Sequence, residues 1–224
     1  MIKKLQSLKK KKGFTLVELI VVIAIIGVLA AILVPTMLGY VTSSRVTSAN
    51  STAASIKNNV DTFLTNADTA GYGMLKGSGN NSQISITVSS GTWTVTNPNT
   101  GATGAFKNGN GKTWGGSGSG AAGDTKVSVT APETLLAIEL ADLFPEIQTA
   151  SMIIYVEGGK TMAVAYTADT DGGITAGTDC PGITAGAAGA AGGWSATTFA
   201  WDNSTAGVSS TGFIVGTAPT VALG

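Results

Sequence analysis

The sequence has no histidine, and Cys180 is its only cysteine among 224 residues. Without an imidazole, neither a histidine general base nor a histidine metal ligand can form. A nucleophilic triad of serine or cysteine with histidine is excluded for the same reason. A lone cysteine cannot close an intramolecular disulfide, and we interpret Cys180 as a small buried hydrophobe. No motif organises the scattered carboxylates, so we predict that the chain is not an enzyme.

Charged residues are also scarce, at 12% of the chain, and they are unevenly distributed. Six of the 13 basic residues lie within the first 12 positions, at Lys3, Lys4 and Lys9 to Lys12. The remainder of the chain has 7 basic and 13 acidic residues, which is a net charge near −6. Because phosphate backbones are bound by clustered Lys and Arg, this acidic remainder does not indicate nucleic-acid binding.

Polar side chains are absent from Leu19 to Val34, a run of 16 residues. Together with Phe14 to Val17, the run has about the 20 residues that a helix needs to cross a bilayer. Glu18 interrupts it near its start, where a carboxylate in hydrocarbon costs roughly 2.5–3.5 kcal/mol. A charge at that position requires a partner.

Three kinds of N-terminal segment combine a basic start with an apolar run. A secretory signal is cleaved after the apolar part, but here the small residues lie inside the run and an amphipathic pattern continues past Pro35. A plain single-span anchor with cytoplasmic lysines leaves Glu18 without a role. The third kind is cut before the apolar run, here between Gly13 and Phe14, and the residues favour it.

The segment from Gly13 to Glu18 resembles the prepilin signature of the type IV pilin superfamily, in which a basic leader ending in Gly precedes Phe-Thr-Leu-x-Glu and an apolar helix. The residues that match it are Gly13, Phe14, Thr15, Leu16 and Glu18. Pro35 falls where many pilins have a helix-kinking proline, and the resemblance covers about the first 50 residues. It implies that a membrane aspartic peptidase removes residues 1–13 as a leader and methylates the new amino group of Phe14.

The resemblance also implies how the subunit assembles. Cleavage leaves an ammonium on Phe14, and Glu18 of an axially shifted neighbour in a helical homopolymer is expected to pair with it. Such a buried pair specifies register more than it stabilises, because a misaligned neighbour leaves both charges unpaired. The expected partners are further copies of the chain, the prepilin peptidase and methyltransferase, a pilus assembly platform and the membrane. We expect the chain in the cytoplasmic membrane before assembly and in an extracellular pilus afterwards.

Two other functions would use the same N-terminal segment. A pseudopilin of a type II secretion or competence system would form a short piston. A membrane-tethered carbohydrate-binding protein would use the segment for export only and would bind a host-surface or polysaccharide ligand through its C-terminal part. The size of that part and its long glycine-rich loops favour a displayed pilus subunit, with adhesion, motility and DNA uptake all left open.

The predicted fold is α+β, with a long N-terminal helix packed on an antiparallel β-sheet. Residues 14–66 are predicted to form this helix, membrane-spanning in its first half and kinked or locally broken at Pro35, which lacks an amide donor. Beyond Pro35, apolar residues recur every three or four positions and predict one buried stripe. The stripe consists of Val46, Ala49, Ala53, Ile56, Val60, Phe63 and Leu64. Residues 67–224 are predicted to form a β-rich globular domain.

Two hairpins are predicted in this domain from strand-like runs around glycine-containing turns. They are Gln83–Val88 with Thr92–Thr96, and Ser151–Val156 with Lys160–Thr167. A short helix is predicted at Glu133–Leu143. Residues 97–123 are mostly Gly, Asn, Ser and Thr, so we predict a long loop there. Further strand-like pieces are residues 197–201 and 212–215.

Two weaker site hypotheses concern the C-terminal part. Asp169, Asp171 and Asp179 have oxygens suited to Ca²⁺, but their spacing fails the EF-hand pattern at both ends, so a solvated turn is favoured. Trp114 and Trp194 lie in glycine-rich segments and would stack on sugar rings if exposed. No other cofactor is predicted.

Overall fold

The computed structural model describes residues 14–72, 81–97, 114, 116–157, 159–168, 182–183, 199–200 and 214–219. The chain divides into two compact units, residues 1–43 and residues 44–224. One helix, α2 (Leu16–Ala67), has residues in both units. The expected leader, residues 1–13, and Cys180 lie outside the described residues.

The described part of the first unit is helical from Leu16 onward, and its large apolar side chains are exposed, between 88% at Phe14 and 44% at Val41. By length and composition, α2 contains a stretch that can cross a membrane. Pro35 lies inside α2, and the helix continues through it. The expected local break is therefore absent, because one proline removes one backbone hydrogen bond and the flanking turns keep theirs. A kink at Pro35 stays a prediction.

In the second unit, α2 has the expected stripe, of which Val46, Ala49 and Phe63 are only half-buried. Ala53, Ile56, Val60 and Leu64 are buried, and Ala67 extends the stripe to the end of the helix. Burial of a side chain such as Ile or Leu contributes about 1.5–3 kcal/mol. A π-turn, η2 (Asp68–Tyr72), follows, and its Gly71 has a φ of 89°, the left-handed conformation that commonly ends a helix.

A six-stranded antiparallel sheet has the order β3-β2-β1-β4-β5-β8. Its strands are β1 (Asn81–Ser89), β2 (Thr92–Asn97), β3 (Gly116–Ala121), β4 (Thr149–Glu157), β5 (Lys160–Thr167) and β8 (Gly216–Ala218). Both predicted hairpins, β1–β2 and β4–β5, are confirmed. Strands β6 (Gly182–Ile183) and β7 (Phe199–Ala200) pair separately. Of the strand expected at residues 212–215, residues 212–213 lie outside the described residues, and β8 begins just after it, at Gly216.

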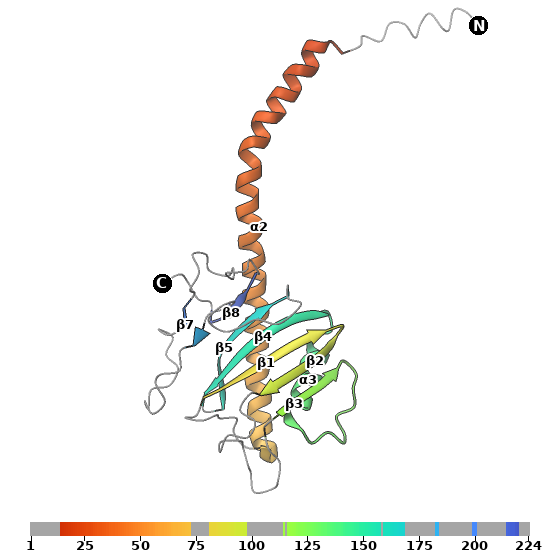
Figure 1. The fold of residues 1–224 in the computed structure, drawn as a ribbon, viewed down its shortest axis with the longest axis vertical. Coiled ribbons are helices and arrows are strands. Elements are labelled where there is room, and N and C mark those ends of the chain that lie inside the picture. The colour runs from red at the N-terminus through yellow and green to blue at the C-terminus, as the bar shows by residue number, and fades with distance from the viewer. Residues whose placement is uncertain are drawn as a thin grey trace, which may run out of the picture. The chain divides into compact units, whose positions relative to one another are not determined.

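The core lies between one face of the six-stranded sheet and two helices, α2 and α3 (Pro132–Leu143), which confirms the α+β prediction (Figure 1). Helix α3 occupies the predicted position and packs beside β2 and β3. Sheet side chains such as Ile86, Trp93 and Met152 are buried in the same cluster as Leu136 and Leu140 of α3.

Strand β3 lies within residues 97–123, where a loop was predicted, and at residues 116–121 that prediction is wrong. Its sequence, GSGSGA, has little strand propensity. The reason is tertiary: a side chain at Gly118 would overlap the backbone of Thr134, and one at Gly120 would overlap Ile138. Glycine allows α3 to approach this strand closely.

Strands β4 and β5 are buried on both faces. Ser151, Ile153 and Tyr155 of β4 point away from the helices, yet each is at most 3% exposed. Their partners across the ladder are Thr167, Ala165 and Ala163, which are equally buried. This explains why β4 is nearly continuous in apolar residues, whereas β1 and β2 alternate.

Candidate functional site

The first turn of α2 contains a reciprocal set of hydrogen bonds between Thr15 and Glu18. The backbone N–H of Thr15 donates to Oε2 of Glu18 at 2.8 Å, and the Thr15 hydroxyl donates to the same oxygen at 2.7 Å. The backbone N–H of Glu18 approaches Oγ1 of Thr15 at 3.2 Å. This arrangement is a capping box, in which two backbone donors at a helix start are satisfied by side chains.

This capping role of Glu18 was missed from the sequence, although its signal is present. Thr15-Leu16-Val17-Glu18 has the Thr-x-x-Glu spacing that precedes an apolar helix. The carboxylate is therefore held by its own chain beside Phe14. Its proposed partner, an amine at Phe14 of a neighbour, would approach a carboxylate that is already oriented.

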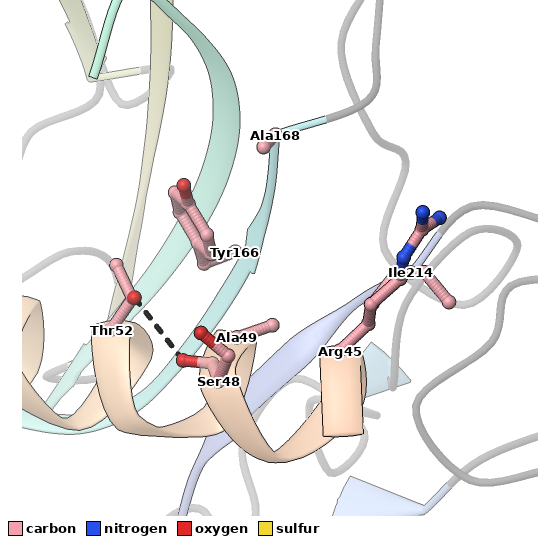
Figure 2. A pocket seen from close by; sticks show the side chains of 7 residues that line it. All are labelled: Arg45, Ser48, Ala49, Thr52, Tyr166, Ala168 and Ile214. Carbon is pink, nitrogen blue, oxygen red and sulfur yellow. Dashed lines mark hydrogen bonds between the residues drawn. The ribbon is translucent and has the colours of Figure 1, made fainter. Parts of the chain in front are cut away.

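A cavity of about 360 Å³ lies in the second unit between α2, the end of β5 and Ile214. It is lined by Arg45, Ser48, Ala49, Thr52, Tyr166, Ala168 and Ile214. Figure 2 shows the Tyr166 ring over the helical turn that bears Ser48, with the Arg45 side chain at one end. The Thr52 hydroxyl donates to the carbonyl oxygen of Ser48 at 3.2 Å.

The described residues that line this cavity offer groups suited to binding. Arg45 supplies a permanent positive charge, and Ser48, Thr52 and Tyr166 supply hydroxyl groups. Among the described lining residues there is no carboxylate.

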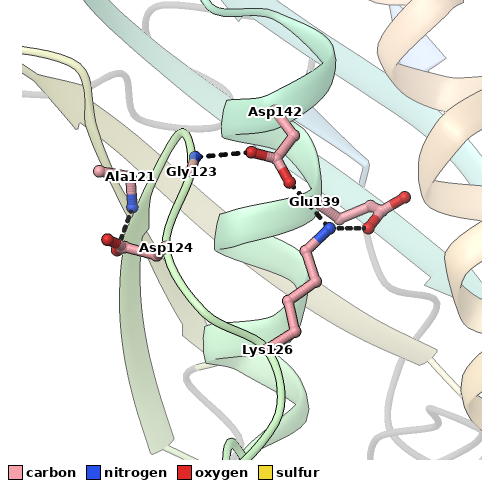
Figure 3. Close-up of polar contacts among 6 residues, drawn as sticks. All are labelled: Ala121, Gly123, Asp124, Lys126, Glu139 and Asp142. Carbon is pink, nitrogen blue, oxygen red and sulfur yellow. Dashed lines mark hydrogen bonds and ion pairs between the residues drawn. The ribbon is translucent and has the colours of Figure 1, made fainter.

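A second polar cluster fastens the connection between β3 and α3 (Figure 3). Lys126 Nζ lies 2.6 Å from Oε2 of Glu139 and 2.8 Å from Oδ2 of Asp142. The N–H of Gly123 donates to Oδ1 of Asp142 at 2.8 Å. Hydrogen bonds from Lys126 and then Gly123 hold the pKa of Asp142 below its ordinary value, and bonds to Asp142 and then Glu139 raise the pKa of Lys126. Lys126 bridges the two carboxylates, and the cluster serves to position this connection.

Replacing Lys126 by methionine is expected to lower the free energy of unfolding by less than about 1 kcal/mol at pH 7, because the pairs are exposed. The lowered pKa of Asp142 means that its contribution is present above about pH 3.9 and is lost as pH falls further. The raised pKa of Lys126 means that its contribution is lost only as pH rises above about 10.4. Urea unfolding at pH 7 and pH 2.5 (roughly 1.4 below the aspartate reference) measures the contribution of Asp142. An equal effect of the substitution at the two pH values would contradict this account.

The remaining expected site residues have different outcomes. Trp114 is 1% exposed and packs edge-on against Phe63, with ring centroids 6.1 Å apart. A buried indole presents no face to a sugar, so the structure does not support Trp114 as a glycan-binding residue; it is part of the core. Gly13, Trp194, Asp169, Asp171 and Asp179 lie outside the described residues. Within the described residues, no group of three or more His, Cys, Asp or Glu is placed to hold a metal ion.

The N-terminal segment is similar to segments of known proteins. Residues 8–34 match the family described as "Prokaryotic N-terminal methylation motif". The chain is 37% identical over 71 residues to a type IV major fimbrial protein FimA of Dichelobacter nodosus, covering 32% of this chain and 46% of that protein. It is 48% identical over 54 residues to the type IV major alpha-pilin of Moraxella bovis, covering 24% of this chain and 34% of that protein.

The likeness is partial in length. A fimbrial protein of Moraxella nonliquefaciens is 41% identical over 71 residues, covering 29% of this chain and 46% of that protein. The chain thus spans less than half the length of these curated relatives. No solved structure matches the chain significantly.

Proposed function

We propose, from the premise that the N-terminal segment of this chain belongs to the type IV pilin superfamily, that the chain is a structural subunit of a type IV pilus. A peptidase would cut between Gly13 and Phe14 and methylate the amino group of Phe14, and the mature chain would polymerise through α2. The observation that carries the proposal is the exposure of the apolar stretch from Phe14 to Val41. Exposed apolar area of this extent marks a membrane or protein contact surface.

The charge of Glu18 favours a role in filament assembly over a role as a simple membrane anchor. A carboxylate in a membrane helix is expensive, roughly 2.5–3.5 kcal/mol at the helix centre on the membrane-insertion scale. The capping box offsets part of this cost by satisfying Oε2. The remaining negative charge would be neutralised by the Phe14 ammonium of a neighbour. A plain anchor would use Glu18 as a helix cap but would have no ammonium to pair with its charge.

The proposed partners are copies of the same chain, the prepilin peptidase and methyltransferase, and an assembly platform. The proposed location is the cytoplasmic membrane before assembly and the cell-surface pilus after it. The relatives are described as fimbrial proteins and pilins. This description favours a pilus subunit over a secretion pseudopilin or a tethered carbohydrate-binding protein.

The deciding test is mass spectrometry of protein sheared from cells and pelleted as filaments. We expect a mature chain that begins at N-methylated Phe14. Gly13→Leu should leave the full-length chain in the membrane, because the peptidase accommodates only a small residue at this position, whereas Gly27→Ala, at a position with open space, should be processed normally. Filaments built from chains that retain residues 1–13 would contradict the proposal.

A further inference from the structure

The face of β1, β2 and β3 that points away from the helices is a regular array of hydroxyl groups. Alternate residues of a strand point to opposite faces, and the core residues Ile86 and Val95 therefore have Ser or Thr neighbours on the outer face. Two aligned rows cross the three strands. They are Thr87–Thr94–Ser119 and Ser85–Thr96–Ser117.

The array is exposed and ordered. Thr87, Thr96, Ser117 and Ser119 are exposed, and Ser85 and Thr94 are half-buried. Hydroxyl groups of adjacent strands bond to one another, with Thr94 Oγ1 3.0 Å from Ser119 Oγ and Thr96 Oγ1 3.3 Å from Ser117 Oγ. Strand geometry sets the grid at about 4.8 Å between strands and roughly 6.8 Å along them.

The composition of this face excludes most partners. The six grid positions include no Lys, Arg, Asp or Glu, so the face has no charge with which to bind phosphate, anionic lipid or acidic peptide. They include no aromatic or aliphatic residue, so the face lacks the apolar centre of a protein interface. Charged side chains on edge and surface strands usually prevent non-specific association. These six positions have no charged side chain.

We infer that this hydroxyl array binds the surface of a neutral, insoluble polysaccharide. Each Ser or Thr hydroxyl both donates and accepts, which matches the hydroxyl groups of a neutral glycan. An open strand face cannot enclose a soluble sugar as a concave pocket does. A repeating array of hydroxyl groups forms several hydrogen bonds at once only with another repeating surface.

One array binds weakly, because each hydrogen bond that replaces water contributes little net affinity. Repetition along a filament would raise the avidity by roughly 100-fold or more where several copies bind together. This gain alone rests on the proposed function; binding by a single chain does not.

The test is co-sedimentation of the full chain, unassembled in detergent micelles, with microcrystalline cellulose and with insoluble chitin. Wild type should be depleted by at least one of them. A triple variant, Thr87→Val, Thr94→Val and Thr96→Val, keeps side-chain volume and strand propensity but removes three hydroxyls. Each lost hydrogen bond should weaken binding by a factor of roughly 2–10. The partition coefficient of this variant on the solid should therefore fall about 10-fold or more.

Thr125→Val with Thr130→Val is the matched control, because both threonines are exposed in the connection between β3 and α3 and lie outside the array. Circular dichroism must show the same fold in all variants. A second variant, Thr94→Lys, places one charge at the centre of the array and should also reduce binding. Failure of wild type to bind either solid, or equal binding by the triple variant, would overturn the inference. Loss of filament assembly would not alter this measurement, so the two proposals fail separately.

Discussion

Replacing Gly216 by alanine is expected to lower the free energy of unfolding by about 3 kcal/mol or more, at the upper end of overpacking effects. Gly216 of β8 lies against α2, where an added Cβ would overlap the carbonyl group of Ala49 and press on the amide of Asn50. These atoms belong to a helical backbone, which cannot rotate aside as a side chain can. Displacing β8 would also break the bond from the N–H of Thr217 to Oδ1 of Asn50, 2.7 Å long.

Urea unfolding of the full chain in detergent, followed by circular dichroism, measures the effect of Gly216→Ala. Gly39→Ala is the control, because a Cβ at Gly39 meets no atom within 4 Å. In the exposed helix this change should be neutral or stabilising by less than about 1 kcal/mol. If Gly216→Ala were as stable as the control, the close contact of β8 with α2 would be wrong.

Substituting glutamine for Glu18 is expected to abolish filament assembly while cleavage and insertion continue. Gln can replace Glu in a capping box, so the helix start should persist and only the charge is lost. A neighbour's ammonium would then be buried without its counter-charge, which costs about 3–5 kcal/mol. That cost lowers the equilibrium for adding a subunit by more than about 100-fold. The measurement is the yield of pelleted filaments.

Thr15→Val separates the two roles of Glu18. This substitution removes both hydroxyl bonds of the capping box but leaves the carboxylate charge, so assembly should be retained. Glu18→Ala removes both cap and charge and should assemble as poorly as Glu18→Gln. Normal assembly of Glu18→Gln together with failure of Thr15→Val would mean that Glu18 acts as a helix cap and not as the charge that sets register.

Local patterns were sufficient for much of the fold. The spacing of Ala53, Ile56, Val60 and Leu64 predicted the buried stripe of α2, because helical periodicity alone determines which residues share a face. The hairpin β1–β2 followed from alternation around Ser90 and Gly91, whose φ values of 49° and 75° are those of a tight two-residue turn. The candidate N-terminal site was likewise local, and its capping box was legible in four consecutive residues.

Other features depended on contacts between distant segments. Trp114 lies among glycines, and the sequence left open whether it is buried or exposed; Phe63 of α2 packs against its ring. The cavity beside Arg45 is lined by residues of α2 and β5 and by Ile214. Arg45 and Ile214 are more than 160 residues apart in the sequence. The hydroxyl array requires the register of three strands, and no pattern within one strand specifies its neighbours.

The sequence by itself determined the apolar helix, the position of Glu18, the α+β class and the two hairpins, because each depends on residues close together in the chain. Only the tertiary structure decided that GSGSGA is a strand, since its glycines have no propensity for one and are required by the approach of α3. It also decided that Gly216 lies against Ala49 and that β4 is buried on both faces. These are consequences of packing, in which the space available to a residue is set by segments far away in the chain.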